Sequence, residues 1–130
     1  MREIKFRVWH PDEGNMYYFN CFKEITDWQA DDFYRADNTD DACVDFMQFT
    51  GLHDKNGKGI YEGDIIFIKG ETKLLDIKGK VEYSNILAQF IITNTGSIVN
   101  EAEPLGDYEE EDIEVIGNIY DNKELLNETN

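Results

Sequence analysis

The chain has 130 residues, of which 41% are hydrophobic, and these include eight Phe and seven Tyr. This length and composition predict one domain, or two small lobes, around a packed interior, and they exclude a disordered protein. The 12 Lys and Arg are outnumbered by 28 Asp and Glu, which gives a net charge of -16. Because duplex binding depends on basic side chains at phosphates, we expect no direct binding to nucleic acid.

The first predicted elements form a β-hairpin. Charged and apolar residues alternate over Ile4–Trp9, which is typical of a strand with one face in solvent. A turn at Pro11–Gly14 leads to a second alternating segment, the aromatic-rich Met16–Phe22. The stretch Ile25–Asp41 fits either a long loop or a short helix. Another strand is predicted over Val44–Phe49.

Strong turn and strand signals follow in the middle of the chain. The pair Asn56-Gly57 readily supplies two positive φ angles, so it predicts a type I′ turn between strands. Ile65–Ile68 is a short apolar run between glycines, which favours a buried strand over a helix. Oxygen-bearing side chains from Asp54 onward also suggest a calcium loop, but Lys58 stands at the fifth position, where it would repel the cation. We therefore predict a structural turn and no calcium site.

The remaining pattern predicts further short strands and one helical turn. One strand is predicted over Leu74–Tyr83, with a bend or bulge at Gly79. Two more, Ile86–Thr93 and Ser97–Val99, flank a hairpin turn at Asn94–Gly96. A last strand is predicted over Ile113–Ile119. Asn122 is predicted to cap a terminal helical turn through Leu126. Glycine-linked strands between residues 60 and 120 favour a small closed barrel or a curled sheet.

These elements predict a mainly β fold with three regions. Residues 1–46 are expected to form an N-terminal β-hairpin lobe that packs on a small β-barrel at 47–120. Residues 121–130 are expected to form a short helical turn and a frayed tail. The spacing of the segments does not give the order of strands in the sheet.

The chain carries no signal for a membrane or an oxidising compartment. No apolar run is long enough to span a bilayer, and the N-terminal residues alternate in charge, unlike a signal peptide. We therefore expect a cytoplasmic protein without membrane contact. Cys21 and Cys43 are then predicted to be small buried hydrophobic residues. Together with His10 and His53 they lack the spacing of a zinc site, so no metal or cofactor is expected.

Two acidic blocks, 31–45 and 101–114, carry most of the excess charge. The second block holds eight acids and no base, which is typical of a solvated loop. A functional interpretation also exists, since surface carboxylates can imitate the phosphates of a duplex and occupy the basic groove of a DNA-binding protein. Mimicry would lose its main support if the two blocks lay at opposite ends of the molecule.

Several segments, in order along nearly the whole chain, resemble the YopX family of small phage and prophage proteins, found chiefly in Gram-positive bacteria. They are Arg2–Trp9, Met47–Leu52, Asp54–Gly57, Ile60–Ile66, Val115–Tyr120 and Glu124–Leu126. Members commonly carry an acid just after the first Trp, whereas here His10-Pro11 precedes Asp12. The regions 23–46 and 69–112 follow no motif of the family.

The resemblance implies an SH3-like barrel in the C-terminal half, no established activity, and association of some members into oligomers. It transfers no catalytic residue to this chain. The recurring residues that we single out as a candidate interaction surface are Trp9, Tyr61, Glu62, Asp64 and Tyr120. In an extended chain Glu62 and Asp64 would face the same side, as an acid–base or magnesium-binding pair does. The simpler interpretation is that one caps the turn and the other pairs with Lys58 or Arg7.

We therefore expect a phage or prophage accessory protein that is not an enzyme and that binds a host or phage protein as an interaction module. Two alternatives remain. The first is an acidic DNA mimic that inhibits a host DNA-binding protein. The second is a small enzyme that uses the Glu62/Asp64 carboxylate pair. Association into a homo-oligomer is compatible with all three.

Overall fold

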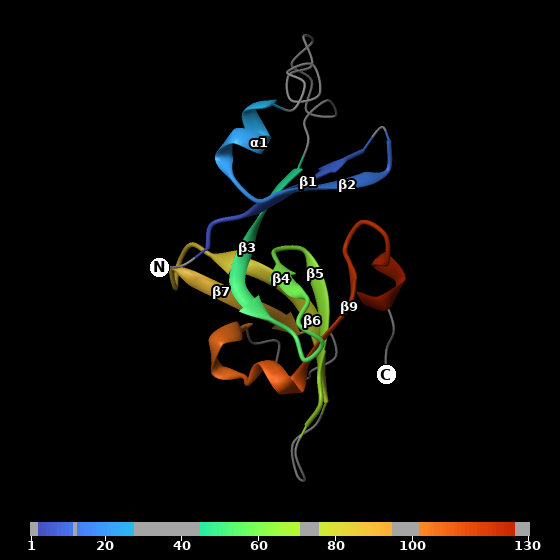
Figure 1. Ribbon diagram of the computed structural model, residues 1–130. Helices are drawn as coiled ribbons and strands as arrows, with labels where there is room; N and C mark the ends of the chain where they lie inside the picture. The colour runs from blue at the N-terminus through green and yellow to red at the C-terminus, as the bar shows by residue number, and fades with distance from the viewer. Residues whose placement is uncertain (1–2, 12, 28–44, 71–75, 95–101, 127–130) are drawn as a thin grey trace. The chain divides into compact units, whose positions relative to one another are not determined.

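The computed structural model describes residues 3–11, 13–27, 45–70, 76–94 and 102–126 (Figure 1). Within these residues the fold is mainly β, as predicted, and its strands form two antiparallel sheets. The four-stranded sheet has the order β2-β1-β3-β4, and the five-stranded sheet has the order β8-β7-β6-β5-β9. The chain divides into two compact units, Met1–Phe49 and Thr50–Asn130.

The N-terminal unit holds the predicted β-hairpin. The hairpin joins β1 (Phe6–His10) to β2 (Asn15–Phe19) in antiparallel register. On its other side β1 pairs with the first part of β3 (Asp45–His53). Gly14 makes the turn possible, because it adopts a φ of 67° and donates its N–H to the His10 carbonyl oxygen at 2.8 Å. The hairpin prediction is confirmed.

Two expectations change in the segment after β2. The strand ends earlier than predicted, because the helix α1 (Phe22–Asp27) begins at the last residue of the predicted strand. The stretch expected to be a loop or a short helix starts inside α1, and its residues from 28 onward lie outside the described part. Cys21 lies in the bend between β2 and α1 and is exposed, so the prediction of a buried cysteine is wrong there. Cys43 lies outside the described residues.

The C-terminal unit is built around β5 (Asp64–Ile68). This strand lies inside the five-stranded sheet, between β6 (Ile77–Ser84) and β9 (Ile113–Asn118). Ile65 and Ile66 point to opposite faces of the strand and are both completely buried. The buried strand predicted for this apolar run is therefore confirmed.

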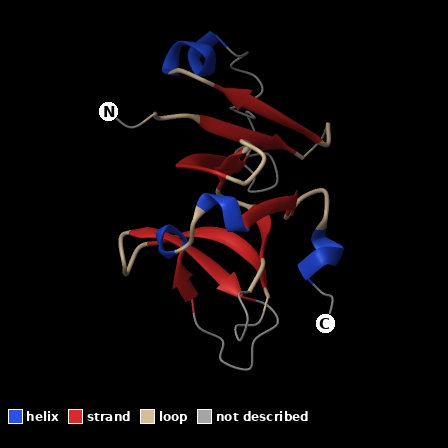
Figure 2. Cartoon of the chain, turned by 60° about the horizontal axis from the view of Figure 1, so that its bottom comes forward, coloured by secondary structure: helices blue, strands red, loops and turns tan. Residues whose placement is uncertain are grey.

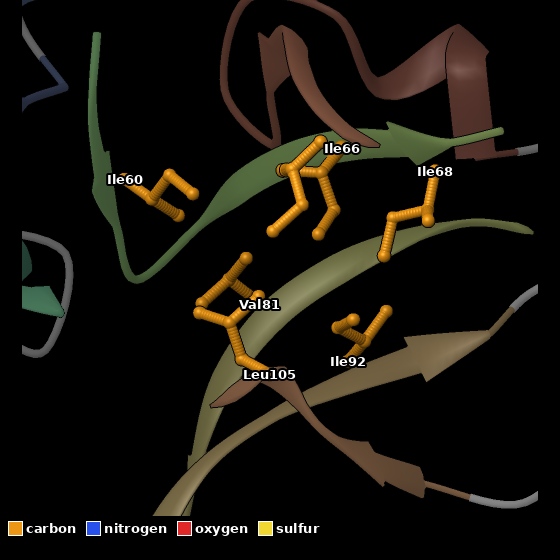
Figure 3. Close-up of a cluster of buried hydrophobic side chains, with 7 residues drawn as sticks. Ile60, Ile66, Ile68, Val81, Ile92 and Leu105 are labelled. Atoms are coloured by element: carbon orange, nitrogen blue, oxygen red, sulfur yellow. The ribbon is translucent and has the colours of Figure 1, made fainter. Parts of the chain in front are cut away.

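The hydrophobic core of the unit lies against this sheet (Figure 3). Its members are Ile60, Ile66, Ile68, Val81, Ile92, Leu105 and Ile113. They come from β4 (Gly59–Tyr61), β5, β6, β7 (Gln89–Asn94), β9 and the segment that follows β8. Complete burial of an aliphatic side chain contributes about 1.5–3 kcal/mol, so this cluster is the main apolar stabilisation of the unit.

The five-stranded sheet is open, with β8 (Ala102–Pro104) and β9 at its ends. The finer expectation of an SH3-like barrel is not decided by this strand order and stays a prediction. The ladder between β5 and β9 contains a bulge, since Ile65 lies opposite Gly117 while Ile66 lies opposite Val115. One extra residue, Ile116, is thereby accommodated in β9.

Gly79 does not mark the bulge that the sequence suggested. It stays in register opposite Ile66 of β5 and Asn94 of β7. A Cβ atom at this position would lie 2.4 Å from the carbonyl oxygen of Thr93 and 2.9 Å from Cγ2 of Ile92. The glycine is therefore needed for the close approach of β6 to β7.

The acidic segment 101–114 was predicted to be a solvated loop, and this is wrong for its described part. After β8 it forms two short 3-10 helices, η2 (Leu105–Asp107) and η3 (Glu110–Asp112), before β9 begins. Leu105 is 1% exposed and belongs to the core, which anchors the segment. The carboxylates remain on the surface, as expected: Asp107, Glu109, Glu110 and Glu111 are all exposed.

The ends of several predicted strands also differ. The helical turn predicted after Asn122 is confirmed as the 3-10 helix η4 (Lys123–Leu126), one of the short helices drawn in blue in Figure 2. The strand predicted from Ile86 begins only at Gln89, because residues 85–88 form the turn of the β6–β7 hairpin. The strand predicted at 97–99 lies outside the described residues.

Candidate functional site

The turn between β3 and β4 is organised by the carboxylate of Asp54, which is 4% exposed. Its Oδ1 accepts hydrogen bonds from the backbone N–H groups of Asn56 and Lys58, both at 2.9 Å. The Asp54 N–H donates to the Lys58 carbonyl oxygen at 2.8 Å, and the Asp54 carbonyl oxygen accepts from the Gly57 N–H at 2.9 Å. One residue thus holds both ends of the turn.

This turn is not the type I′ turn predicted from Asn56-Gly57. Within the described residues Ala88 is the only residue other than glycine with a positive φ, so Asn56 has a negative φ, whereas Gly57 has a φ of 83°. The arrangement is that of a type I turn followed by a left-handed glycine, a common three-residue hairpin loop. The hydrogen bond from the Asn56 N–H to the Asp54 carboxylate closes a local Asx turn. This Asx turn favours the type I conformation over type I′.

The same carboxylate also reaches a distant strand. Oδ2 of Asp54 accepts a hydrogen bond from the Val115 N–H of β9 at 3.0 Å, and the neighbouring Lys55 N–H donates to the Ile113 carbonyl oxygen at 2.8 Å. Burial by itself would raise the pKa of Asp54, but the hydrogen bonds from Val115, Lys58 and Asn56 outweigh it and lower that pKa below 3.8. A carboxylate saturated in this way is a structural anchor.

Asp64 organises a second turn, which links β4 to β5. It is 1% exposed, and its Oδ2 accepts a hydrogen bond from the Tyr61 N–H at 2.8 Å. Gly63 adopts a φ of 85° and donates its N–H to the Val81 carbonyl oxygen at 2.8 Å. Asp64 therefore caps the turn, as the simpler interpretation of the carboxylate pair expected.

The premise of the paired-carboxylate hypothesis does not hold in this turn. Glu62 and Gly63 are turn residues, so the chain from Glu62 to Asp64 is not extended and alternation does not place the two carboxylates on one side. Glu62 is half-buried, whereas Asp64 is inside the unit. Within the described residues, no group of three His, Cys, Asp or Glu side chains is arranged to hold a metal ion.

The five residues singled out from the sequence are only partly accessible. Tyr61 is 8% exposed and Asp64 is 1% exposed, so neither offers contact area to a partner. Glu62 and Tyr120 are half-buried, and the Ile119 N–H donates to the Gly63 carbonyl oxygen at 2.9 Å, which brings the β9 end next to the turn. Trp9 lies in the other unit, on β1, and is half-buried.

Among the described residues of the C-terminal unit, the most exposed large apolar side chains lie elsewhere, at the turn of the β6–β7 hairpin (yellow in Figure 1). Ile86 is 95% exposed, Leu87 51% and Tyr83 44%. The Tyr83 and Phe90 rings stack edge to face, with centroids 5.2 Å apart and an interplanar angle of 76°. We call Tyr83, Ile86, Leu87 and Phe90 the hairpin tip.

Sequence reasoning missed the hairpin tip because it assigned Ile86 to a strand. One signal was available: residues 83–100 contain no Asp, Glu, Lys or Arg, although 31% of the chain is charged. The residue type in this turn is also unusual. Ala88 adopts a φ of 54° at a position that glycine or asparagine usually fills. The Ser84 hydroxyl oxygen accepts the Leu87 N–H at 3.1 Å and fixes the loop locally.

Hydrogen bonds within the acidic segment hold its backbone and one of its half-buried carboxylates. The Tyr108 N–H donates to the Leu105 carbonyl oxygen at 3.3 Å, and the Asp112 N–H donates to the Glu109 carbonyl oxygen at 3.0 Å. The Tyr108 hydroxyl donates to the Glu103 carboxylate. Burial, together with that hydrogen bond and the negative charge of Glu103, raises the pKa of Tyr108 well above 10.

Comparison with known proteins finds a family profile and solved structures that are similar to this chain. A profile described as YopX protein matches residues 5–127. Among solved structures, the chain is similar to protein EF1440 from Enterococcus faecalis, with a TM-score of 0.62 and 27% identity over 97% of this chain and 99% of that chain. It is also similar to protein YopX from Bacillus subtilis, with a TM-score of 0.57 and 22% identity over 93% of this chain and 96% of that chain.

A search of curated proteins gives no significant match. None of the helices that the structure describes is long and apolar enough to cross a membrane. The family profile covers the hairpin of the N-terminal unit, both carboxylate-capped turns and the five-stranded sheet. On that match, this chain belongs to the YopX family.

Proposed function

We propose that this chain is an accessory protein of a phage or prophage that acts as a non-catalytic protein-interaction module, and that its contact surface is the hairpin tip. The observation that carries the proposal is the exposure of Ile86 and Leu87 in the turn and of Tyr83 at the adjoining end of β6. Scattered apolar side chains on a surface are ordinary, but a group of large exposed ones around a single turn is typical of a binding surface.

The backbone of the tip supports this proposal. A left-handed conformation costs a residue other than glycine about 1–2 kcal/mol, and Ala88 adopts it with a φ of 54°. A turn selected only for stability would carry glycine there. Departures from local rules cluster at functional sites, so the strained turn and the exposed Ile86 point to the same surface.

The charge distribution defines the chemistry of the partner. Residues 83–100 carry no charged side chain, while the whole chain has a net charge of -16. A bilayer with anionic lipids and a nucleic acid would both repel such a chain at long range. A protein with an apolar pocket and basic side chains around it would be attracted by the chain and would receive the neutral tip.

The carboxylates support a non-catalytic role. Asp54 accepts three backbone N–H groups, and Asp64 is inside the unit and caps a turn. Both are used by the fold. A small enzyme that uses Glu62 with Asp64 is therefore the least supported alternative.

The interaction surface is tested with matched variants. Ile86→Asp places a charge at the tip, and Ile4→Asp makes the same change at a residue that is 56% exposed in the other unit. Both variants should keep the wild-type melting temperature, because both side chains are largely in solvent. Proteins captured from host lysate by the wild type would be purified, and their binding measured by titration calorimetry.

We expect Ile86→Asp to weaken the purified partner's binding by about tenfold or more, as truncation of a contact residue at an interface centre does. Ile4→Asp should leave it unchanged, and about 1 M salt should reduce it only slightly, since apolar contacts are not screened. A purified partner that binds Ile86→Asp as tightly as the wild type would refute the assignment of the tip.

An acidic mimic of DNA is the second candidate, because the exposed Asp107, Glu109 and Glu111 lie on a segment anchored by Leu105. The DNA-mimic hypothesis predicts a different result in the same binding assay. Binding would collapse in about 1 M salt and on neutralisation of these three carboxylates, and it would not respond to Ile86→Asp. The convergence of the two acidic blocks is not tested, since residues 31–44 lie outside the described part.

Two further proposals concern architecture and assembly. We propose that the five-stranded sheet belongs to an SH3-like barrel, which is supported by its consecutive antiparallel strands β5 to β8 and by a core on one side. We also propose that the chain can form a homo-oligomer. Sedimentation at increasing protein concentration measures this, and an unchanged sedimentation coefficient would refute it.

A further inference from the structure

We propose that Asn56 is a site of spontaneous covalent modification, at which its side-chain amide is lost as ammonia, and that the turn around Asp54 sets the rate of this loss. The reaction requires no partner protein. Asn56 and Gly57 are both exposed, in the loop between β3 and β4.

The reaction uses the protein's own backbone as nucleophile and water as the second reactant. The Gly57 nitrogen loses its proton to solvent and attacks Cγ of Asn56, so that a new N–Cγ bond forms. The Cγ–Nδ2 bond breaks, and the leaving nitrogen takes up a proton and departs as ammonia. Water then opens the resulting cyclic imide at one of its two carbonyl groups and leaves an aspartyl or an isoaspartyl residue.

The residue after Asn56 permits this attack. A side chain on the following residue hinders the approach of its backbone nitrogen, and Gly57 has none. The surroundings add no obstacle, since even a Cβ atom built on Gly57 would have no heavy atom within 4 Å. Glycine also allows the backbone rotations that ring closure requires.

The folded turn restrains the same step. The Gly57 N–H, whose nitrogen must attack, donates to the Asp54 carbonyl oxygen at 2.9 Å. The Asn56 N–H donates to Asp54 Oδ1, also at 2.9 Å. Ring closure requires the turn to open and break these hydrogen bonds, so the reaction is slow in the folded protein and fast once the turn opens.

The product would weaken the turn that formed it. An isoaspartyl residue adds one methylene group to the main chain and places a second carboxylate beside Asp54. The hydrogen bonds to Oδ1 cannot keep their geometry, and the hydrogen bond that the Val115 N–H donates to Oδ2 would loosen with them. Modification at an exposed loop is thus transmitted to β9.

The test incubates the whole chain at mildly alkaline pH, folded in buffer and unfolded in urea. Mass spectrometry follows the peptide of residues 55–62, and an isoaspartyl methyltransferase detects the isoaspartyl product. Asn85 is an internal control, because it is also exposed in a turn but precedes the β-branched Ile86. Hydrogen exchange of the Val115 amide reports the state of β9.

We expect Asn56 to convert at least about tenfold faster in urea than in the folded chain, since opening breaks two hydrogen bonds and each tenfold corresponds to about 1.4 kcal/mol. Asp54→Ala should give a similar acceleration without urea, and Val115 exchange should rise as the product forms. If this variant does not fold, the rates of Asn56 conversion in the wild type, folded in buffer and unfolded in urea, still test the proposal. Equal rates of Asn56 in both conditions, or an Asn85 rate equal to that of Asn56, would overturn the proposal.

Discussion

Asp54 and Val115 are 61 residues apart in sequence, yet Oδ2 of the first accepts the backbone N–H of the second at 3.0 Å. The carboxylate joins a tight turn to a strand at the end of the five-stranded sheet. Its other oxygen accepts two further N–H groups within the turn. The anchor should therefore contribute measurably to the stability of the C-terminal unit.

Asp54→Asn should lower the free energy of unfolding by about 1–3 kcal/mol, because an amide NH₂ group would replace an acceptor oxygen and leave a buried donor unsatisfied. Urea denaturation measures the loss. Asp107→Asn is the control, since it makes the same change of charge at an exposed position. That control should stay within about 0.5 kcal/mol of the wild type. An equal loss in both variants would contradict the anchoring role.

The contribution of Asp54 should depend on pH in one direction. Its pKa is lower in the folded chain than the 3.8 of the unfolded chain, so its stabilisation is present above that value and is lost as pH falls through the folded pKa. The difference in unfolding free energy between wild type and Asp54→Asn should be constant above about pH 5 and should shrink below about pH 4. Urea denaturation across this range checks it. A constant difference down to strongly acidic pH would contradict the assignment.

Gly79→Ala should destabilise the sheet by about 1–3 kcal/mol, because its Cβ would lie 2.4 Å from the Thr93 carbonyl oxygen and the backbone of β7 would have to move. Thermal unfolding measures the effect. Gly106→Ala is the control, since its Cβ would meet nothing within 4 Å. A melting temperature equally lowered in both variants would show that space at Gly79 is not the cause.

Ala88→Gly should stabilise the chain by about 0.5–1 kcal/mol, because glycine adopts a φ of 54° without steric cost. The reciprocal change, Gly57→Ala, introduces a Cβ at a φ of 83° in open space and should destabilise by a similar amount. Urea denaturation of both variants isolates the backbone effect. Changes of the same sign in the two variants would refute the strain at Ala88.

Sequence patterns predicted correctly those elements whose structure depends mainly on the residues within the element itself. The apolar run of β5 and the β1–β2 hairpin are confirmed, because β5 is buried on both faces and the two hairpin strands pair in antiparallel register. The solvent-exposed face predicted for β1 is wrong, since Arg7 is only 1% exposed and lies beside the buried Val8. The turn type at Asn56 was mispredicted, since the neighbouring Asp54 carboxylate imposes a different φ. The preference of an Asn-Gly pair for a type I′ turn takes no account of that hydrogen bond.

Long-range relationships were beyond the sequence. Nothing in the residues around Asp54 indicates that its carboxylate reaches β9, because strand order is not encoded in spacing. The hairpin tip was missed for a related reason: an apolar residue at the end of a hairpin has the same pattern whether it faces the core or the solvent. A single Leu105 likewise anchors an acidic segment that has no apolar period.

The attachment of the β3–β4 turn to β9 also limits how the sheet can grow. A strand at the end of a sheet normally offers its backbone groups to any extended peptide and so invites aggregation. Here the Ile113 carbonyl oxygen and the Val115 N–H are already engaged by Lys55 and Asp54. An incoming strand would have to displace the buried Asp54 carboxylate before it could pair with β9. The turn therefore blocks the addition of further strands, and so the growth of a fibril, at this edge of the sheet.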